Sequence, residues 1–492
     1  MFRPLNIERI KTIFIVVLFM MTILLFYFLW KDISFGGIKL PLDFLGQGTT
    51  VVVPDTNQII VPDAISVNFG GGNYTKITRN TNEYWLSFRN ELNKFGETQN
   101  IAITEITKAQ YEKVNSFRSI EVDFNFWLPF VASCNALDIK TQSNYGSIDA
   151  VSKVAYSSAS PESILIYDGK NNKYYRMATA KDVTKIKDLI TNIETKEKGK
   201  FYQLGAYLGI GNSTLMPVST TSQMKKIGYN EELFVSTPNS MLSFEESFFG
   251  KGFDFVRKIT ENDNTTIYMY GYGKKILIIN SNGKFEYKEE LNDTDYNETS
   301  YFDSFDLAVK FISTHGGWNT INGNQISPRL VSAKETLNSG KKGYKFTFEA
   351  TVLGEPVNYE GSTYPLSVEM TGSQIINYQR ELLDIRATEI EELSDTKEKS
   401  AIAPIDIISK QYTYINQILS KEGIQVVGKT EDKLFEFTAL RISDIKTGYF
   451  RTKEDSTTTI KFLIPAWIIE LNNIQIYFDL YDGKALGYSK SN

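Results

Sequence analysis

An uncharged apolar run of 19 residues, TIFIVVLFMMTILLFYFLW, occupies residues 12–30 and constrains this chain more than any other feature. As a helix it would be about 28 Å long, which matches the hydrocarbon core of a bilayer. The competing interpretation is a cleaved signal peptide, whose apolar region is typically about 7–15 residues long and ends at small residues. Here the run is longer and ends in Leu-Trp-Lys-Asp, and no second run of similar length follows. We therefore expect an uncleaved, single-pass transmembrane helix.

The charges beside this run predict its orientation. Arg3, Arg9 and Lys11 precede it, whereas the two charges that follow have opposite signs and nearly cancel. An excess of basic residues marks the cytoplasmic side of a membrane helix. Residues 1–11 are thus expected in the cytoplasm, and the bulk of the chain after residue 30 outside the cell membrane.

Two scarce residue types restrict the chemistry. Cys134 is the one cysteine and His315 the one histidine, so the chain can form neither an internal disulfide nor a thiolate or imidazole zinc centre of its own. The net charge of −5 leaves no basic surplus for general nucleic-acid binding. We expect no metal, no cofactor and no nucleic-acid partner.

The region after the anchor predicts an α+β protein of antiparallel sheets with packed helices. Residues 31–61 are expected to form an extended juxtamembrane stretch, and residues 62–260 one or more N-terminal α+β domains. Strand-like alternation appears at Ala64–Phe69 and Glu121–Phe130, and hairpin signals at 163–177. Apolar residues at helical spacing predict two helices, one with Trp85, Phe88, Leu92 and Phe95, and one with Val183, Ile186, Ile190 and Ile193.

The last third of the chain contains an apparent repeat. Residues 261–385 form a first unit, in which an amphipathic helix at 303–314 precedes several strands, and residues 404–492 repeat this order from a helix near 405–419. LSVEMTGSQIINY and IYFDLYDGKALGY share an alternating strand, a glycine turn and a returning strand. The polar residues 386–403 are predicted to link the two units.

Motifs of familiar enzymes are missing. The glycine-rich stretches near 209 and 271 lack the spacing of a phosphate loop, and the acidic stretch near 292 lacks the glycine and glutamate of an EF-hand. His315 is expected at a helix C-terminus, followed by glycines suited to a left-handed cap, where a cation interacts favourably with the helix end. Cys134 is expected to be a buried, inert thiol. Pairs of carboxylates suited to a glycosidase cannot be chosen from sequence, because their pairing is spatial.

With this layout, the chain resembles the YycH/YycI family of membrane-anchored regulators of low-GC Gram-positive bacteria. The similarity lies in the anchor, in the PDAISVNFG strand from Pro62 with its Trp85 helix, and in the paired C-terminal units. The stretches Ile464–Trp467 and Tyr477–Gly483 are also similar to PepSY-like modules. The resemblance covers most of the exported chain as architecture and only short stretches as motif.

What the resemblance implies is regulation without catalysis. Members of the family associate with an essential cell-wall sensor histidine kinase, partly through their transmembrane helices, and a YycI-like paralogue is a second expected partner. The segment lacks the small residues that let membrane helices approach closely, so contact with the kinase would rely on bulky and threonine side chains. The candidate contact residues are Thr12, Ile15, Leu18, Phe19, Thr22, Phe26 and Trp30.

Two other classes of function stay open at this point. The first is a cell-envelope assembly factor or a cell-wall enzyme that uses the same anchor. The second is a PepSY-type inhibitor of an exported protease. A pocket with convergent carboxylates would favour the enzyme.

Overall fold

The computed structural model describes residues 53–79, 81–180, 182, 185–196, 199–218, 224–231, 238–281, 283–292, 294, 296–318, 329–361, 365–390, 400–451 and 461–490. The predicted anchor at 12–30, its flanking charges and residues 31–52 lie outside these ranges. No helix within the described ranges is both long and apolar enough to cross a membrane. The anchor and its orientation therefore stay predictions.

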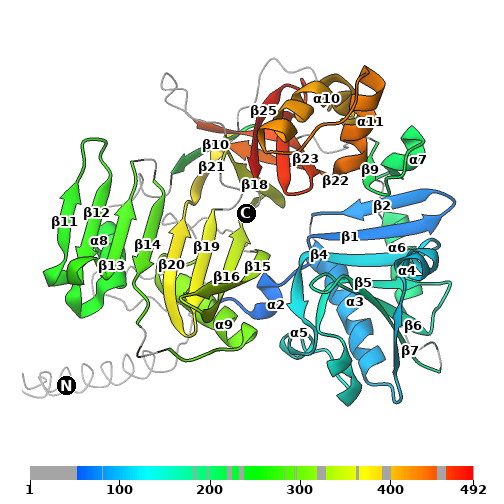
Figure 1. Ribbon diagram of the computed structural model, residues 1–492, viewed down its shortest axis with the longest axis horizontal. Coiled ribbons are helices and arrows are strands. Elements are labelled where there is room, and N and C mark those ends of the chain that lie inside the picture. The colour runs from blue at the N-terminus through cyan, green and yellow to red at the C-terminus, as the bar shows by residue number, and fades with distance from the viewer. Residues whose placement is uncertain are drawn as a thin grey trace, which may run out of the picture. The chain divides into compact units, whose positions relative to one another are not determined.

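The first sheet has nine strands, paired antiparallel in the order β3-β7-β6-β5-β4-β1-β2-β8-β9 (Figure 1). The strand predicted at 64–69 and the hairpin predicted at 163–177 are both confirmed in this sheet. Its strands are β1 (Ala64–Gly70), β2 (Asn73–Ile77), β3 (Ala102–Ile106), β4 (Ser119–Pro129), β5 (Ala150–Ser157), β6 (Ser163–Asp168), β7 (Lys173–Ala178), β8 (Phe201–Gln203) and β9 (Leu215–Pro217).

Helices cover the two faces of this sheet unequally. The helices α3 (Thr81–Gly96), α5 (Phe130–Ala136) and α6 (Ile186–Lys196) pack on one face, where the predicted apolar stripe of α3 is buried. On the other face, α4 (Lys108–Asn115) packs over β4, β5 and β7. Because successive side chains of a strand point to opposite faces of the sheet, the apolar residues of β1 and β4 face α3, α5 and α6, and their polar residues face α4. The short helices α2 (Thr56–Ile59), η1 (Ser143–Ser147) and α7 (Leu204–Leu208) complete this region.

The second sheet has eight antiparallel strands in the order β11-β12-β13-β14-β20-β19-β16-β15. The helices α8 (Pro238–Phe249) and α9 (Tyr301–Thr314) bury aromatic side chains against one face of it. Its strands are β11 (Arg257–Thr260), β12 (Thr266–Tyr270), β13 (Lys275–Ile279), β14 (Phe285–Glu289), β15 (Arg329–Asn338), β16 (Lys341–Glu349), β19 (Leu366–Thr371) and β20 (Gln374–Arg380), and its short helical turns are η3 (Gly250–Phe255) and η4 (Gly271–Gly273).

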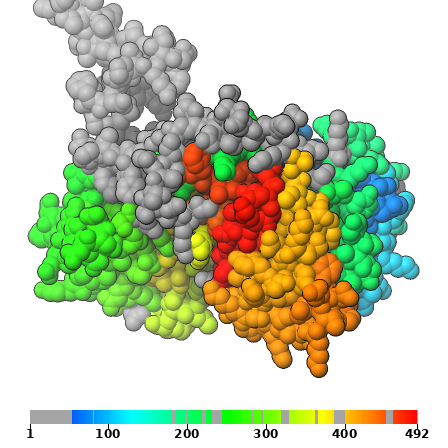
Figure 2. Space-filling view, turned by 90° about the horizontal axis from the view of Figure 1, so that it is seen from above, coloured from blue at the N-terminus to red at the C-terminus, as the bar shows by residue number. Residues whose placement is uncertain are grey.

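The third sheet is covered by α10 (Pro404–Lys421) and α11 (Glu431–Arg441), which pack against each other and share its apolar core. In Figure 2 these helices are the orange surface beside the red C-terminal strands. Among the described strand pairs, β18 with β22 is parallel. The strands are β10 (Ile227–Glu231), β17 (Thr351–Val352), β18 (Glu355–Tyr359), β21 (Leu383–Ile390), β22 (Ile442–Arg451), β23 (Lys461–Leu471), β24 (Ile474–Asp479) and β25 (Ala485–Lys490).

The order of elements in the two predicted C-terminal units is similar. In the second sheet α9 precedes β15, β16, β19 and β20, which form an antiparallel meander, and in the third sheet α10 and α11 precede the meander β22 to β25. The sheets also recruit distant segments. β10 and β11 lie before residue 261 in sequence but pair with strands of the third and second sheets, and β21 continues to Ile390, into the predicted linker.

Candidate functional site

The residues singled out from the sequence fall into two groups. The candidate kinase contacts in segment 12–30 and the basic flank lie outside the described residues. His315 and Cys134 are described, and each has a structural explanation.

His315 is the C-cap of α9, as predicted. Its Nδ1 lies 2.8 Å from the carbonyl oxygen of Phe311 and its Nε2 lies 3.1 Å from that of Ser247. Its ring stacks on Phe311 with 3.9 Å between the ring centroids. Burial lowers the pKa of His315, which favours the neutral imidazole. The interaction of a cation with the helix end, expected from the sequence, is therefore weakened by desolvation.

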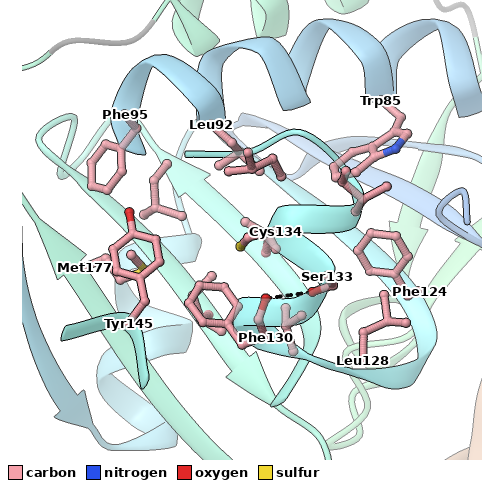
Figure 3. Close-up of a pocket in the computed structure, with 16 residues that line it drawn as sticks. Trp85, Leu92, Phe95, Phe124, Leu128, Phe130, Ser133, Cys134, Tyr145 and Met177 are labelled. Carbon is pink, nitrogen blue, oxygen red and sulfur yellow. Dashed lines mark hydrogen bonds between the residues drawn. The ribbon is translucent and has the colours of Figure 1, made fainter. Parts of the chain in front are cut away.

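Cys134 lies on α5 and borders an apolar cavity of about 50 Å³ between α3 and the first sheet. In Figure 3, Leu92, Phe95, Phe130 and Tyr145 surround the same space, and the dashed line is the Ser133 hydroxyl donating to the Phe130 carbonyl. Burial raises the pKa of the thiol to about 12. A cavity this small and apolar has no room for an organic ligand, so Cys134 is a packing residue, as predicted.

A polar groove of about 700 Å³ lies on the α4 side of the first sheet. Its floor is built from β1, β2, β4 and β5 and extends to Tyr167 on β6 and Tyr174 on β7. One wall is α4, and the opposite end is formed by residues 213–215 and by Ser443 at the start of β22. Antiparallel register aligns the floor residues in rows across the strands. Lys76, Ser66 and Glu121 form one row, and Tyr74, Asn68 and Ser119 form the next.

The wall helix α4 is fixed by local sequence. Thr107 caps it through a reciprocal pair of hydrogen bonds with Gln110, the capping-box arrangement. Tyr111 and Asn115 are four residues apart, so both face the sheet. The Tyr111 hydroxyl and the Asn115 amide each donate to Glu121 on β4, at 2.9 Å.

A compact charge cluster lies on the groove floor. Lys153 on β5 is directly opposite Asp123 on β4 and diagonal to Glu121, with Nζ to carboxylate distances of 2.8 and 3.2 Å. Burial alone would lower the pKa of Lys153, but the two carboxylates raise it above its ordinary value. Burial and then the Glu121 carboxylate raise the pKa of Tyr111. The raised pKa values of Lys153 and Tyr111 keep both groups protonated at neutral pH.

The other charges that line the groove are paired as well. Lys108 and Glu112 form an ion pair along α4 at 3.6 Å, and Lys76 pairs with Asp444 on β22. The rest of the lining is mainly hydroxyl and amide groups, with Ala64, Val67 and Leu215 as its apolar members. The groove is therefore polar, but its charges compensate one another.

A second cluster of buried charges joins the three sheets. Asp63, just before β1, lies 3.1 Å from Arg329 on β15 and 3.5 Å from Lys446 on β22. Burial would raise the pKa of Asp63, but Lys446 and Arg329 together lower it to about 2. For Glu470 on β23, burial outweighs the opposing attraction of Lys446 and raises the pKa to about 7. Arg79 and Glu355 form a further ion pair between the first and third sheets.

Sequence reasoning missed both clusters. Glu121 and Asp123 stood in a strand that was correctly predicted, but their partner Lys153 is about 30 residues away. The available signal was the polar half of the alternating EVDFNF stretch, whose charged members face the groove. Among the described residues, no group of three or more His, Cys, Asp or Glu side chains is arranged to hold a metal ion.

Comparisons with known proteins bear on the fold. No protein-family model matches the chain, and no curated protein matches it in sequence. The crystal structure of YycH from Bacillus subtilis is similar with a TM-score of 0.53 and 12% identity, over 86% of this chain and 96% of that one. The YpeB C-terminal domain of Bacillus megaterium aligns at a TM-score of 0.24 and 11% identity, over 52% of this chain and 98% of that one, which is too weak to inform the fold. The chain has a YycH-like fold.

Proposed function

We propose that this protein is a non-catalytic, extracytoplasmic regulator that associates with a sensor histidine kinase of cell-wall metabolism. The observation that carries the proposal is the YycH-like fold, which extends over 86% of the chain. It agrees with the family resemblance of the sequence, whose members regulate such a kinase. The predicted anchor would hold the protein in the cell membrane as a single-pass protein, with the folded region outside.

The proposed mechanism is a shift in the signalling equilibrium of the kinase. An effector moves a two-state protein only by binding one state better than the other. A bulky helix such as residues 12–30 can do this by packing differently against the kinase helices in their two arrangements. The folded region would add a second contact, with a YycI-like paralogue as a further partner.

The test is a pull-down from gently solubilised membranes, followed by mass spectrometry. The decisive variant replaces residues 12–30 with the same 19 residues in scrambled order, leaving residues 1–11 and 31–492 intact. This control keeps length and hydropathy but removes the specific packing surface. We expect the native chain to recover a sensor kinase and the scrambled chain to lose it, with altered kinase autophosphorylation.

Other outcomes would redirect the assignment. Recovery of wall-synthesis or secretion components without a kinase would indicate an envelope assembly factor or a cell-wall enzyme. Recovery of an exported protease would indicate an inhibitor of PepSY type. A scrambled anchor that still associates and signals normally would remove the proposed helix contact.

A further inference from the structure

The groove on the α4 side of the first sheet has the size of a ligand site. Its volume of about 700 Å³ falls inside the range of roughly 300–1,000 Å³ that is typical of small-molecule pockets. The sheet supplies a rigid floor, because β1 pairs on both sides with β2 and β4. A site on paired strands is held more firmly than one on loops.

The electrostatics of the groove select against a charged ligand. Every lysine and carboxylate in its lining has an ion-pair partner within the described chain: Lys76 with Asp444, Lys108 with Glu112, and Lys153 with Glu121 and Asp123. An anion or a cation entering the groove would have to compete with these pairs. Removing one partner of a largely buried pair such as Lys76 and Asp444 is costly, so competition on the groove floor is unfavourable, whereas the exposed pair Lys108 and Glu112 on the rim adds little to this selection.

The uncharged lining favours a ligand rich in hydroxyl and amide groups. Ten of the 22 lining residues carry a hydroxyl and three carry an amide. Six of these hydroxyls already donate within the chain, so they offer a ligand acceptor lone pairs without a formal charge; they belong to Tyr111, Ser116, Ser119, Tyr167, Thr214 and Ser443.

The shape of the groove and its tyrosine rings favour a sugar ligand over a peptide. A peptide gains affinity from apolar pockets or from an open sheet edge, but this floor is the face of paired strands and has few apolar residues. Instead, the half-buried tyrosines Tyr74, Tyr167 and Tyr174 line the groove, and Tyr167 and Tyr174 stack on each other with 4.8 Å between their ring centroids. A tyrosine offers an apolar ring face together with a polar hydroxyl, which matches the mixed surface of a pyranose ring.

We infer that this groove binds an uncharged, hydroxyl- and amide-bearing oligosaccharide across β1 and β4. The sugar rings lie against the ring of Tyr74 and beside the stacked Tyr167 and Tyr174, and their hydroxyl groups exchange hydrogen bonds with the serine, asparagine and glutamine side chains of the floor and walls. This inference stands on the groove alone and does not depend on the proposed kinase.

Ser66 offers a direct way to block the groove. It lies on the floor between Lys76 and Glu121 in the cross-strand row, and none of the hydrogen bonds described above involves its side chain. Ser66→Trp fills the groove without removing an ion pair. Ser332→Trp is the matched control, because Ser332 is also a half-buried strand serine, in β15 of the second sheet. Tyr74→Ala provides a second groove variant that removes bulk instead of adding it.

The experiment is isothermal titration calorimetry with the full chain in phospholipid nanodiscs, since maltoside detergents carry a competing sugar headgroup. The probes are chitotetraose, the anionic tetragalacturonate and the peptide tetra-alanine. We expect saturable binding of chitotetraose alone, weakened by about tenfold or more in Ser66→Trp and Tyr74→Ala and unchanged in Ser332→Trp. Thermal unfolding of each variant verifies that it is folded.

Three results would overturn the inference. The first is no saturable heat with chitotetraose up to about 10 mM, where binding would be weaker than ordinary sugar recognition. The second is that the Ser66→Trp and Tyr74→Ala variants are folded and bind chitotetraose as tightly as the native protein, which would place the sugar elsewhere. The third is tighter binding of tetragalacturonate or tetra-alanine, which would assign the groove to an anion or a peptide.

Discussion

Two buried carboxyl groups near the junction of the sheets show how far neighbouring charges decide the state of a residue. Asp63 faces Arg329 and Lys446, and its pKa is lowered to about 2. Glu470 also faces Lys446, but burial outweighs that attraction and its pKa is raised to about 7. One carboxyl is thus ionised at every physiological pH, whereas the other titrates near neutrality.

Replacing Glu470 should increase the free energy of unfolding in a pH-dependent way. Because its pKa is about 7 when folded and near 4.5 when unfolded, folding takes up a proton between these values, and stability falls as pH rises through that window. Glu470→Gln removes this loss and keeps a partner for Gln475. We expect the variant to match the native protein near pH 4.5 and to exceed its free energy of unfolding at pH 8 by on the order of 3 kcal/mol. Urea unfolding at both pH values measures this, and equal stability at pH 8 would contradict it.

The rate at which the Cys134 thiol is labelled should report on unfolding. Its burial and its pKa of about 12 leave almost no accessible thiolate at pH 8. Since the chain has one cysteine, labelling has a single source. We expect a maleimide to modify the native protein at least about a hundredfold more slowly than the urea-unfolded protein, in proportion to the rarity of opening. Mass spectrometry over time measures the rate. Rapid labelling of the native protein would show that α5 opens readily.

At the scale of elements, local signals predicted what local physics determines. The α3 stripe, the β6–β7 hairpin and the glycines after α9 all follow from periodicity or turn chemistry within a few residues. The pairing of β10 with β21 and β23 joins residues more than 150 positions apart, and no local pattern contains it. The groove was invisible for the same reason. The sequence showed the polar side of β4, but the register that places Lys153 opposite Asp123 depends on tertiary structure.

Replacing a glycine by alanine should destabilise the protein more after α9 than after α10. Gly316 and Gly423 both have left-handed backbones, with φ of 103° and 83°. A Cβ at Gly316 would lie 3.0 Å from the Arg380 guanidinium, whereas one at Gly423 would meet nothing within 4 Å. We expect Gly423→Ala to cost about 1 kcal/mol of strain, and Gly316→Ala to cost about 2–3 kcal/mol because Arg380 must also move. Thermal unfolding compares them, and equal shifts would show that Arg380 yields freely.

At the scale of the whole molecule, ion pairs add to the apolar contacts that join the first and third sheets. Met216 on β9 of the first sheet belongs to the apolar cluster of the third, and Lys76 pairs with Asp444 and Arg79 with Glu355 between the same sheets. The same sheets also enclose the groove, whose far end is Ser443 beside Asp444. Charges at this junction therefore hold the end of the groove in place as well as joining the sheets.

A double-mutant cycle on Asp63 and Lys446 tests this role. Breaking a buried pair leaves one charge uncompensated, so Asp63→Asn and Lys446→Met should each cost about 3–5 kcal/mol at pH 7. The double variant should cost less than their sum, by a coupling of about 1–3 kcal/mol. The exposed pair Lys108 and Glu112 is the control, with an expected coupling below about 0.5 kcal/mol. Urea unfolding of each set measures both couplings.

The pH dependence of that coupling identifies its source. Since the pKa of Asp63 is lowered to about 2, its contribution is fully present above the unfolded value near 3.8 and is lost as pH falls through 2. The coupling should therefore persist at pH 5 and disappear near pH 2, because a protonated Asp63 no longer attracts Lys446. A coupling as small as that of the control pair at pH 7 would mean that Arg329 alone compensates Asp63. The third sheet would then be joined to the first through Lys76 and Arg79.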